Sequence, residues 1–175
     1  MITVKIMPIV FLFLIFTACG DTTSIVPPVL PHDPVSEGWM ALENYQYSLE
    51  TQDMDLLEET LAAEFVYTLA EVDWDDYDGD GIIDTEFSRQ FYLELVSQMF
   101  SSYEIIELTL EGTSATPWSG DPTGETMQYL RTCYMKAYNW VGGQQEGWMK
   151  HGDASFLCKP DSAGVWRIIE RDDLT

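Results

Sequence analysis

Apolar residues recur every three or four positions in three stretches of the chain, a spacing that places them along one face of an α-helix. In the first stretch, which begins near residue 35 and ends near residue 51, they are Trp39, Leu42, Tyr45 and Leu49. The second stretch follows Asp53, a favourable N-cap, and contains Met54, Leu57 and Leu61. The third contains Phe91, Tyr92, Leu93, Leu95, Val96, Met99, Phe100 and Tyr103. We therefore predict three helices.

The remaining pattern is typical of β-strands. Residues 64–69 predict one short strand, and the second half of the chain has four stretches rich in β-branched and aromatic residues. These four stretches are residues 104–112, 127–140, 147–159 and 165–172. Segments rich in Gly, Pro, Asp or Ser predict hairpin connections at 141–147 and 159–164. Helices followed by consecutive strands predict an α+β fold, with N-terminal helices packed on a curved, mainly antiparallel sheet.

Two segments resemble a known family. They are ENYQYSLETQDMDLLEETLAAEFVY, residues 43–67, and GDASFLCKPDSAGVWRIIERDD, residues 152–173. With the order of the predicted elements, they are similar to the nuclear transport factor 2-like domain, also called SnoaL-like or cystatin-like, over about residues 38–173. The resemblance implies a cone-like α+β barrel with a pocket between the helices and the concave sheet face. Members include isomerases, dehydratases, cyclases, ligand carriers and interaction modules, so the fold alone selects no activity.

Enzymes that resemble this fold place an acidic or histidine base and a hydrogen-bond donor inside the cone. The pocket candidates here are Tyr45, Tyr67 and Tyr134, and the candidate bases are His151 and Asp153. His151 and Asp153 lie two positions apart on a predicted strand and therefore share one face. The alternate positions of that strand are more apolar and form the better core face. We therefore expect both candidate bases on the outer surface and assign no catalytic residue.

The beginning of the chain is a separate segment. The apolar run at residues 6–18 follows Lys5 and is shorter than the roughly 20 residues that a membrane-spanning helix needs. Residues 1–18 are therefore predicted to be a signal peptide. The junction FTACG resembles a bacterial lipobox, which implies cleavage before Cys19 and lipidation of its sulfur.

A tether is predicted between this anchor and the domain. Residues 19–34 contain four prolines, which favour an extended chain, and the domain is expected over residues 35–175. His32 lies in the tether and is expected to be solvated. Acyl chains on Cys19 would hold the protein on a membrane of the bacterial cell envelope. Gly20 resembles the enterobacterial sorting pattern that favours the outer membrane, facing either the periplasm or the surface.

The charge excludes one class of partner. The chain has 30 acidic and 8 basic residues and a formal net charge of -22. Phosphate backbones are repelled by such a surface, so we expect no nucleic-acid partner. With 46% apolar and 13% aromatic residues, the chain has enough core-forming material to fold.

Two cysteines remain once Cys19 is lipidated. Export would place Cys133 and Cys158 in an oxidising compartment, and they lie on consecutive predicted strands. A disulfide would require them to lie nearly opposite each other, and two buried free thiols are an equal alternative. The sequence has no CxxC motif and no histidine cluster, which argues against zinc binding and redox catalysis.

An acidic loop stands out at residues 73–87, DWDDYDGDGIIDTEF, with seven carboxylates and no basic residue. Its spacing resembles the calcium loop of EF-hand and dockerin-like repeats, with Gly81 at the sixth position. The implied ligands are Asp76, Asp78, Asp80, Asp84 and the carbonyl of Ile82. Phe87 stands where those loops carry a bidentate glutamate, so we expect weak calcium binding, about 10⁻⁴ to 10⁻³ M. The alternative is a solvated acidic turn.

Two functions follow from these patterns. The first is a membrane-anchored, noncatalytic envelope module whose cone binds a small apolar ligand or a partner protein, with a calcium-stabilised loop. The alternative is a small isomerase or dehydratase that uses the cone pocket. A homodimer is also compatible with the sequence. An inward Asp or His near a tyrosine in the pocket would favour the enzyme, whereas a cone filled by its own aromatic residues would favour a scaffold or a module that binds a partner protein.

Overall fold

The computed structural model describes residues 31–77 and 79–174 of the chain. The predicted signal peptide, the lipidated Cys19 and most of the predicted tether lie outside the described residues, as does Asp78 of the acidic loop. In the part that is described, none of the helices has the length and apolar character needed to cross a membrane.

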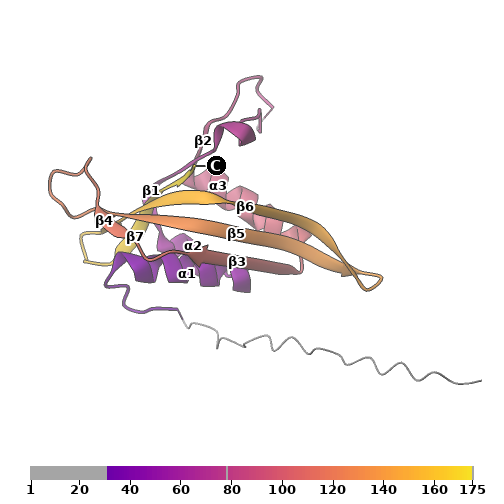
Figure 1. The fold of residues 1–175 in the computed structure, drawn as a ribbon, viewed down its shortest axis with the longest axis horizontal. Helices are drawn as coiled ribbons and strands as arrows, with labels where there is room; N and C mark the ends of the chain where they lie inside the picture. Colours follow the sequence, from indigo (N-terminus) through magenta and orange to yellow (C-terminus); the bar gives the residue numbers. More distant parts are fainter. Residues whose placement is uncertain (1–30, 78, 175) are drawn as a thin grey trace, which may run out of the picture.

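A curved, mainly antiparallel sheet forms one layer, and the helices of the described chain pack against it (Figure 1). The helices are α1 (Gly38–Thr51), α2 (Met54–Thr60) and α3 (Arg89–Ser102), and the 3₁₀ turn η1 spans Glu71–Asp73. The strands are β1 (Leu61–Thr68), β2 (Glu86–Ser88), β3 (Ile105–Glu111), β4 (Ala115–Pro117), β5 (Met127–Val141), β6 (Gln144–Pro160) and β7 (Trp166–Asp173). Their order is β2-β1-β7-β6-β5-β3, with β4 paired to β5. The predicted fold class is confirmed.

Side-chain caps fix the starts of two helices. Asp53 accepts a hydrogen bond from the backbone N–H of Leu56 at 3.0 Å, which confirms it as the N-cap of α2. Ser88 accepts from the backbone N–H of Phe91 at the start of α3. Each cap satisfies one of the N–H groups that the first turn of a helix leaves without a partner.

Three details of the strands differ from the prediction. Leu61 begins β1 instead of ending α2, because it pairs with Ile168 on the parallel neighbour β7. The strands β2 and β4 were not predicted. Each has only three residues paired to its neighbour, which is too short for a hydrophobic alternation to appear in the sequence.

The long hairpin of β5 and β6 turns at two glycines. Gly142 and Gly143 have φ values of 60° and 83°, and positive φ at both central residues is what a type I′ turn requires. Val141 pairs with Gln144, so the connection is shorter than the predicted segment 141–147. A two-residue turn sets the register of every residue pair along the hairpin.

The core lies between the helices and the facing side of the sheet. Leu42, Tyr45 and Leu49 of α1 are each at most 3% exposed, as the helical stripe predicted. Sheet residues that are likewise buried include Phe65, Phe156 and Ile168. Each large apolar side chain that is fully buried contributes about 1.5–3 kcal/mol to folding.

The described residues before α1 lie against the domain. The backbone N–H of His32 donates to Oδ1 of Asn44 at 2.7 Å, and His32 Nε2 lies 2.6 Å from Oε2 of Glu43. The carbonyl of Val35 accepts from the N–H of Trp166 at 3.0 Å. The expectation of a solvated His32 is therefore wrong, because α1 and β7 offer hydrogen-bond partners to this end of the predicted tether.

Candidate functional site

A polar cluster fills the interior between α1, α3 and β7. Its members are Tyr45, Tyr67, Tyr92, Arg171 and Asp173, and we call it the interior cluster. Nη1 of Arg171 donates to the Tyr45 hydroxyl at 2.6 Å, and its Nε and Nη2 each lie 3.0 Å from Oδ1 of Asp173. The hydroxyl of Tyr67 donates to Oδ2 of Asp173 at 2.6 Å, and the hydroxyls of Tyr45 and Tyr92 bond to each other. A buried cation and anion thus neutralise each other.

The protonation states of the interior cluster follow from these contacts. Burial raises the pKa of Tyr67 and of Tyr92, so both remain neutral phenols. Burial alone would lower the pKa of Arg171, but Tyr45, Tyr67 and Asp173 raise it above its ordinary value. Burial would also raise the pKa of Asp173, but Arg171 and the hydrogen bond from Tyr67 bring it below its ordinary value. The carboxylate of Asp173 is therefore a poor proton acceptor.

Lys150 connects the interior cluster to the acidic loop. Its Nζ lies 3.0 Å from Oδ2 of Asp173 and 2.5 Å from Oδ2 of Asp73. The cavity beside Lys150, Arg171 and Asp173 measures only about 20 Å³. That volume holds about one water molecule. Within the described residues, the interior is occupied by the domain's own side chains.

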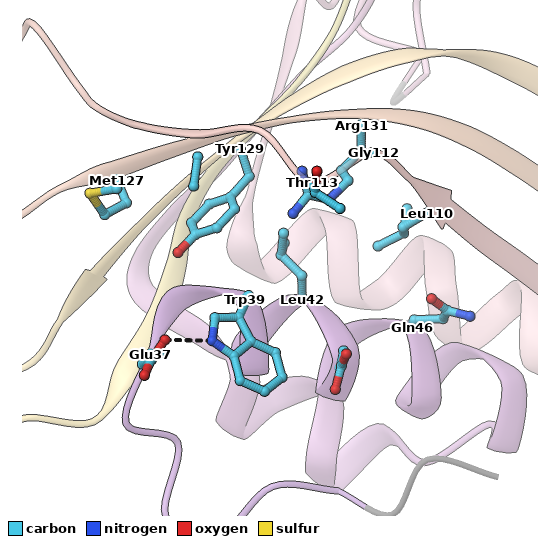
Figure 2. Close-up of a pocket in the computed structure, with 12 residues that line it drawn as sticks. Glu37, Trp39, Leu42, Gln46, Leu110, Gly112, Thr113, Met127, Tyr129 and Arg131 are labelled. Carbon is cyan, nitrogen blue, oxygen red and sulfur yellow. Dashed lines mark hydrogen bonds between the residues drawn. The ribbon is translucent and has the colours of Figure 1, made fainter. Parts of the chain in front are cut away.

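A larger cavity, of about 520 Å³, lies between α1 and the strands β3, β4 and β5 (Figure 2). We call this cavity the α1 groove. Its apolar walls come from Trp39, Leu42, Leu110, Met127 and Tyr129. Trp39 is 38% exposed, so the first residue of the α1 stripe faces the groove and not the closed core.

The sheet wall of the groove follows from strand alternation. Met127, Tyr129 and Arg131 are two positions apart on β5 and share one face. On the helix side, Gly38 permits a close approach, because a Cβ atom there would lie 2.6 Å from the Tyr129 hydroxyl oxygen. A residue larger than glycine would therefore require either the Tyr129 ring or α1 to shift.

Arg131 is the basic residue of the α1 groove and is 9% exposed. Its Nη1 donates to the carbonyls of Leu130 at 2.8 Å and Ser114 at 3.1 Å. Its guanidinium lies 5.2 Å from the centre of the Tyr129 ring. Arg131 forms no ion pair with any residue in the described ranges. Burial lowers the pKa of Arg131, the opposite direction from Arg171.

Solved structures share this architecture. No model of a protein family matches the chain, and neither does any curated protein. A conserved protein from Planctomyces limnophilus superposes with a TM-score of 0.59 at 13% identity, over 78% of this chain and 91% of that chain. A protein with a cystatin-like fold from Caulobacter vibrioides superposes with a TM-score of 0.53 at 12% identity, over 78% of this chain and 84% of that chain. A proposed dehydratase of the nuclear transport factor 2-like family from Streptomyces avermitilis superposes with a TM-score of 0.55 at 12% identity, over 80% of this chain and 94% of that chain.

The domain has the nuclear transport factor 2-like fold. This confirms the resemblance that the two quoted segments carried, at the level of the cone-like architecture. At identities of 12–13% the likeness shows the fold and leaves the activity open.

In the nuclear transport factor 2-like cone, two of the predicted pocket residues lie inside and the third lies on the outer face. Tyr45 and Tyr67 lie inside the cone, in the interior cluster. Tyr134 was predicted for the pocket, but it is 40% exposed and stacks on His151 at a ring distance of 4.4 Å. The prediction for Tyr134 is wrong because inward positions on β5 are the odd-numbered ones, as Cys133 shows. His151 and Asp153 lie on the outer face, as expected.

The cysteines of the domain are not bonded to each other. Both Cys133 and Cys158 are buried free thiols. Cys133 pairs with Gly152, whereas Cys158 pairs with Met127. The two cysteines are therefore six residues apart along the ladder, about 20 Å at 3.3 Å per residue, which no disulfide can span. The predicted connection at 141–147 would bring the two cysteines closer to facing each other, but the actual turn is only two residues long.

The acidic loop projects from the sheet between β1 and β2 (Figure 1). Oδ1 and Oδ2 of Asp76 accept the backbone N–H groups of Gly79 at 2.8 Å and Gly81 at 2.9 Å. A side-chain oxygen of Asp84 accepts the N–H of residue 77 at 3.0 Å. Within the described residues, no group of three or more acidic, histidine or cysteine side chains is arranged to hold a metal ion. The predicted ligand set includes Asp78, which lies outside those residues, so calcium binding stays a prediction.

Sequence reasoning missed the residues that define both cavities. Arg131 and Arg171 lie at inward-facing strand positions. The alternation of inward and outward residues along each strand could have identified these two arginines as interior charges. Trp39 was predicted on the same helical face as the buried residues Leu42 and Tyr45, but it lines the groove. Spacing identifies a face of a helix but not which part of that face the sheet covers.

Proposed function

We propose that the domain is a noncatalytic module that binds a small apolar ligand in the α1 groove, and that lipidation of Cys19 anchors it in a bacterial cell envelope. The contrast between the two cavities carries the proposal: about 20 Å³ in the interior and about 520 Å³ in the α1 groove. Small-molecule sites commonly measure about 300–1,000 Å³ and have mainly apolar and aromatic walls. The α1 groove meets both conditions.

Binding of Nile red, a neutral apolar dye that brightens outside water, tests the groove. Ala115 lines the α1 groove, so Ala115→Trp fills it and should weaken dye binding at least tenfold. Thr116→Trp adds the same side chain at the next position of β4, which does not line the groove, and should bind the dye normally. The proposal fails if the unmodified chain shows no saturable binding, or if Ala115→Trp binds as well as the control.

The alternative, an isomerase or dehydratase, is supported by one feature of the α1 groove. Glu37 and Glu43 line the same cavity as Tyr129, whose pKa burial raises, so that an acid and a neutral phenol are present together. Against this, Oε2 of Glu37 accepts from Nε1 of Trp39 at 2.5 Å, and Oε2 of Glu43 lies 2.6 Å from Nε2 of His32. Each carboxylate therefore already has a side-chain partner in the domain.

Proton abstraction can be tested directly. An enzyme of this kind would exchange the protons next to the carbonyl of cyclohexanone for deuterium in D₂O, a change that NMR follows. We expect the exchange rate with the protein to equal that of buffer. Faster exchange that disappears in Glu37→Gln or Glu43→Gln would favour the enzyme.

The membrane anchor has its own experiment. In a bacterial host, the chain should enter the membrane fraction and incorporate labelled palmitate. Cys19→Ala removes the sulfur that the acyl group would modify, so it should prevent incorporation and release the protein from the membrane. Cys158→Ala is the matched control and should remain anchored. Palmitate incorporation into Cys19→Ala would refute lipidation at this residue.

We also propose that calcium stabilises the acidic loop. The carboxylate spacing supports this. So do the two hydrogen bonds that the Asp76 carboxylate accepts from backbone N–H groups of the loop. At the expected affinity, 5 mM calcium would add about 1–2 kcal/mol to stability and raise the Tm by a few degrees. Magnesium at equal ionic strength should not. No calcium-specific shift, or the same shift in Asp76→Asn/Asp80→Asn, would refute the proposal.

A further inference from the structure

We infer that the ligand of the α1 groove is an amphiphile whose anionic group, a carboxylate in the simplest case, binds the guanidinium of Arg131. The inference rests on the proposed function and adds the polarity of the ligand to it. Its starting point is a cation that is 9% exposed and has no acidic partner among the described residues.

The other arginines of the chain show how unusual this is. Arg89 lies 3.8 Å from Glu58, Arg167 lies 3.2 Å from Asp161, and Arg171 lies 3.0 Å from Asp173. The chain has 30 acidic residues, so carboxylates are abundant. A buried charge is costly unless it is paired, because neighbouring atoms replace water poorly. An arginine that faces a cavity without an acidic partner is therefore suited to an anion that enters from outside.

The carboxylates of the groove do not fill this role. Figure 2 shows Glu37 on the helix side beside Trp39, and Arg131 on the sheet side beside Gly112 and Thr113. Glu37 is bonded to the indole of Trp39, and Glu43 is paired with His32. The helix side of the groove is therefore acidic and the sheet side basic, a polarity that orients a ligand with one charged end.

The walls define the rest of the ligand. Leu110, Met127 and the ring of Tyr129 line the groove together with Arg131, and they offer apolar surface to a hydrocarbon chain. The Nη1 atom of Arg131 is already bonded to two carbonyls, which holds the planar guanidinium in place. A fixed guanidinium matches a carboxylate in a bidentate geometry. The ligand class is therefore a single apolar chain or ring system with one acidic group.

Three probes of equal chain length test this inference by isothermal titration: decanoate, decan-1-ol and decylammonium, each below its micelle-forming concentration. A charge-assisted hydrogen bond favours decanoate over decan-1-ol by about tenfold to a hundredfold. Arg131→Gln should reduce that ratio to near one, and Arg131→Lys should keep part of it. Arg167→Gln removes an equal charge from a partly exposed ion pair away from the groove and should leave the ratio unchanged.

The ratio of affinities separates ligand binding from a structural role of Arg131. Loss of the bond to Ser114 would weaken all three probes together, whereas loss of an anion site changes the ratio alone. Equal binding of decanoate and decan-1-ol by the unmodified chain overturns the inference and leaves the proposed function standing. Tighter binding of decylammonium overturns it in favour of Glu37 and Glu43. Binding of none of the probes by a chain that still binds Nile red overturns the inference alone, and loss of Nile red binding as well overturns the proposed function.

Discussion

Two arginines of one sheet, Arg171 on β7 and Arg131 on β5, are 7% and 9% exposed but have opposite environments. Arg171 bonds to Asp173 and Tyr45, so its charge is neutralised inside the interior cluster. Among the described residues, Arg131 donates hydrogen bonds only to backbone carbonyls, and it faces a cavity of about 520 Å³. Burial therefore does not determine what a charged residue does. The identity of its partners decides whether it stabilises the fold or is available to a ligand.

Loss of the interior cation should have the largest effect. Arg171→Met leaves the carboxylate of Asp173 buried with Lys150 as its remaining cation, and removing one partner of a buried pair costs about 3–5 kcal/mol. Urea unfolding measures the loss. Arg167→Met removes a partly exposed pair and should cost less than about 1 kcal/mol. Equal losses in the two variants would contradict the role we assign to the interior cluster.

Acid should act through the same cluster. Burial raises the pKa of Asp173, but Arg171, Tyr67 and Lys150 together lower it below its ordinary value. A depressed pKa contributes stability that is complete above the unfolded-state pKa of about 3.9 and is lost as the pH falls through the folded-state pKa. We expect unfolding to become easier below about pH 4.

The variant Asp173→Asn isolates this contribution. It should be less stable at pH 7 and show a shallower loss of stability between about pH 4 and pH 2, measured by urea unfolding at each pH. Glu125→Gln, at an exposed position in the segment between β4 and β5, is the control and should follow the unmodified chain. If Asp173→Asn loses stability as steeply as the unmodified chain, other carboxylates dominate acid unfolding.

A single hydroxyl of the interior cluster should have an intermediate effect. Tyr45→Phe removes the acceptor of the Arg171 Nη1 hydrogen bond and the partner of Tyr92, which should cost about 1–3 kcal/mol. Tyr134→Phe removes a hydroxyl from a ring that is 40% exposed and should change stability by less than about 0.5 kcal/mol. Thermal and urea unfolding of both variants measure the difference.

The groove arginine should matter less to the fold. Arg131→Met leaves no buried carboxylate without a partner, so it should cost about 1 kcal/mol or less despite burial similar to that of Arg171. The measurement is the difference in unfolding free energy between Arg131→Met and Arg171→Met. Losses of similar size would end the contrast between the two regions.

The smallest expected effect concerns the reactivity of the two cysteine thiols. One thiol lies near each of the two arginines, so each reports on one region. Burial raises the pKa of Cys133, near Arg171, and of Cys158, near Arg131. Both thiols should resist iodoacetamide in the folded chain and react in urea without a reductant, as peptide mass spectrometry reports. If the urea-unfolded chain is labelled at these positions only after reduction, a disulfide is present and the β5–β6 register that separates the two cysteines is wrong.

Much of the fold could be predicted because helices and strands leave periodic patterns. The stripe of Leu42, Tyr45 and Leu49 and the strands of the long hairpin were predictable, since each depends on many residues. The register was not, because two glycines decide it, and a small error moves Cys133 from Gly152 to a different partner. The fold class was therefore easier to predict than any pair of facing residues.

The candidate site was harder to predict, for a physical reason. A cavity exists where side chains fail to fill the space between elements, and this depends on distances between α1 and β5 that no local pattern contains. Tyr45 and Tyr67, which were predicted as pocket candidates, lie inside the cone in the interior cluster. The sequence did not reveal that these two hydroxyls would form hydrogen bonds with Arg171 and Asp173. The larger cavity is instead the α1 groove.

The position of β7 has a consequence for how the domain is made. It follows every other element in chain order but lies between β1 and β6, and its pairing with β1 is parallel. During synthesis, the earlier strands can form only two separate sheet fragments, each with an open edge at the place that β7 will occupy. The two fragments join when this strand arrives, which brings Arg171 and Asp173 into the centre and makes closure of the domain a late step.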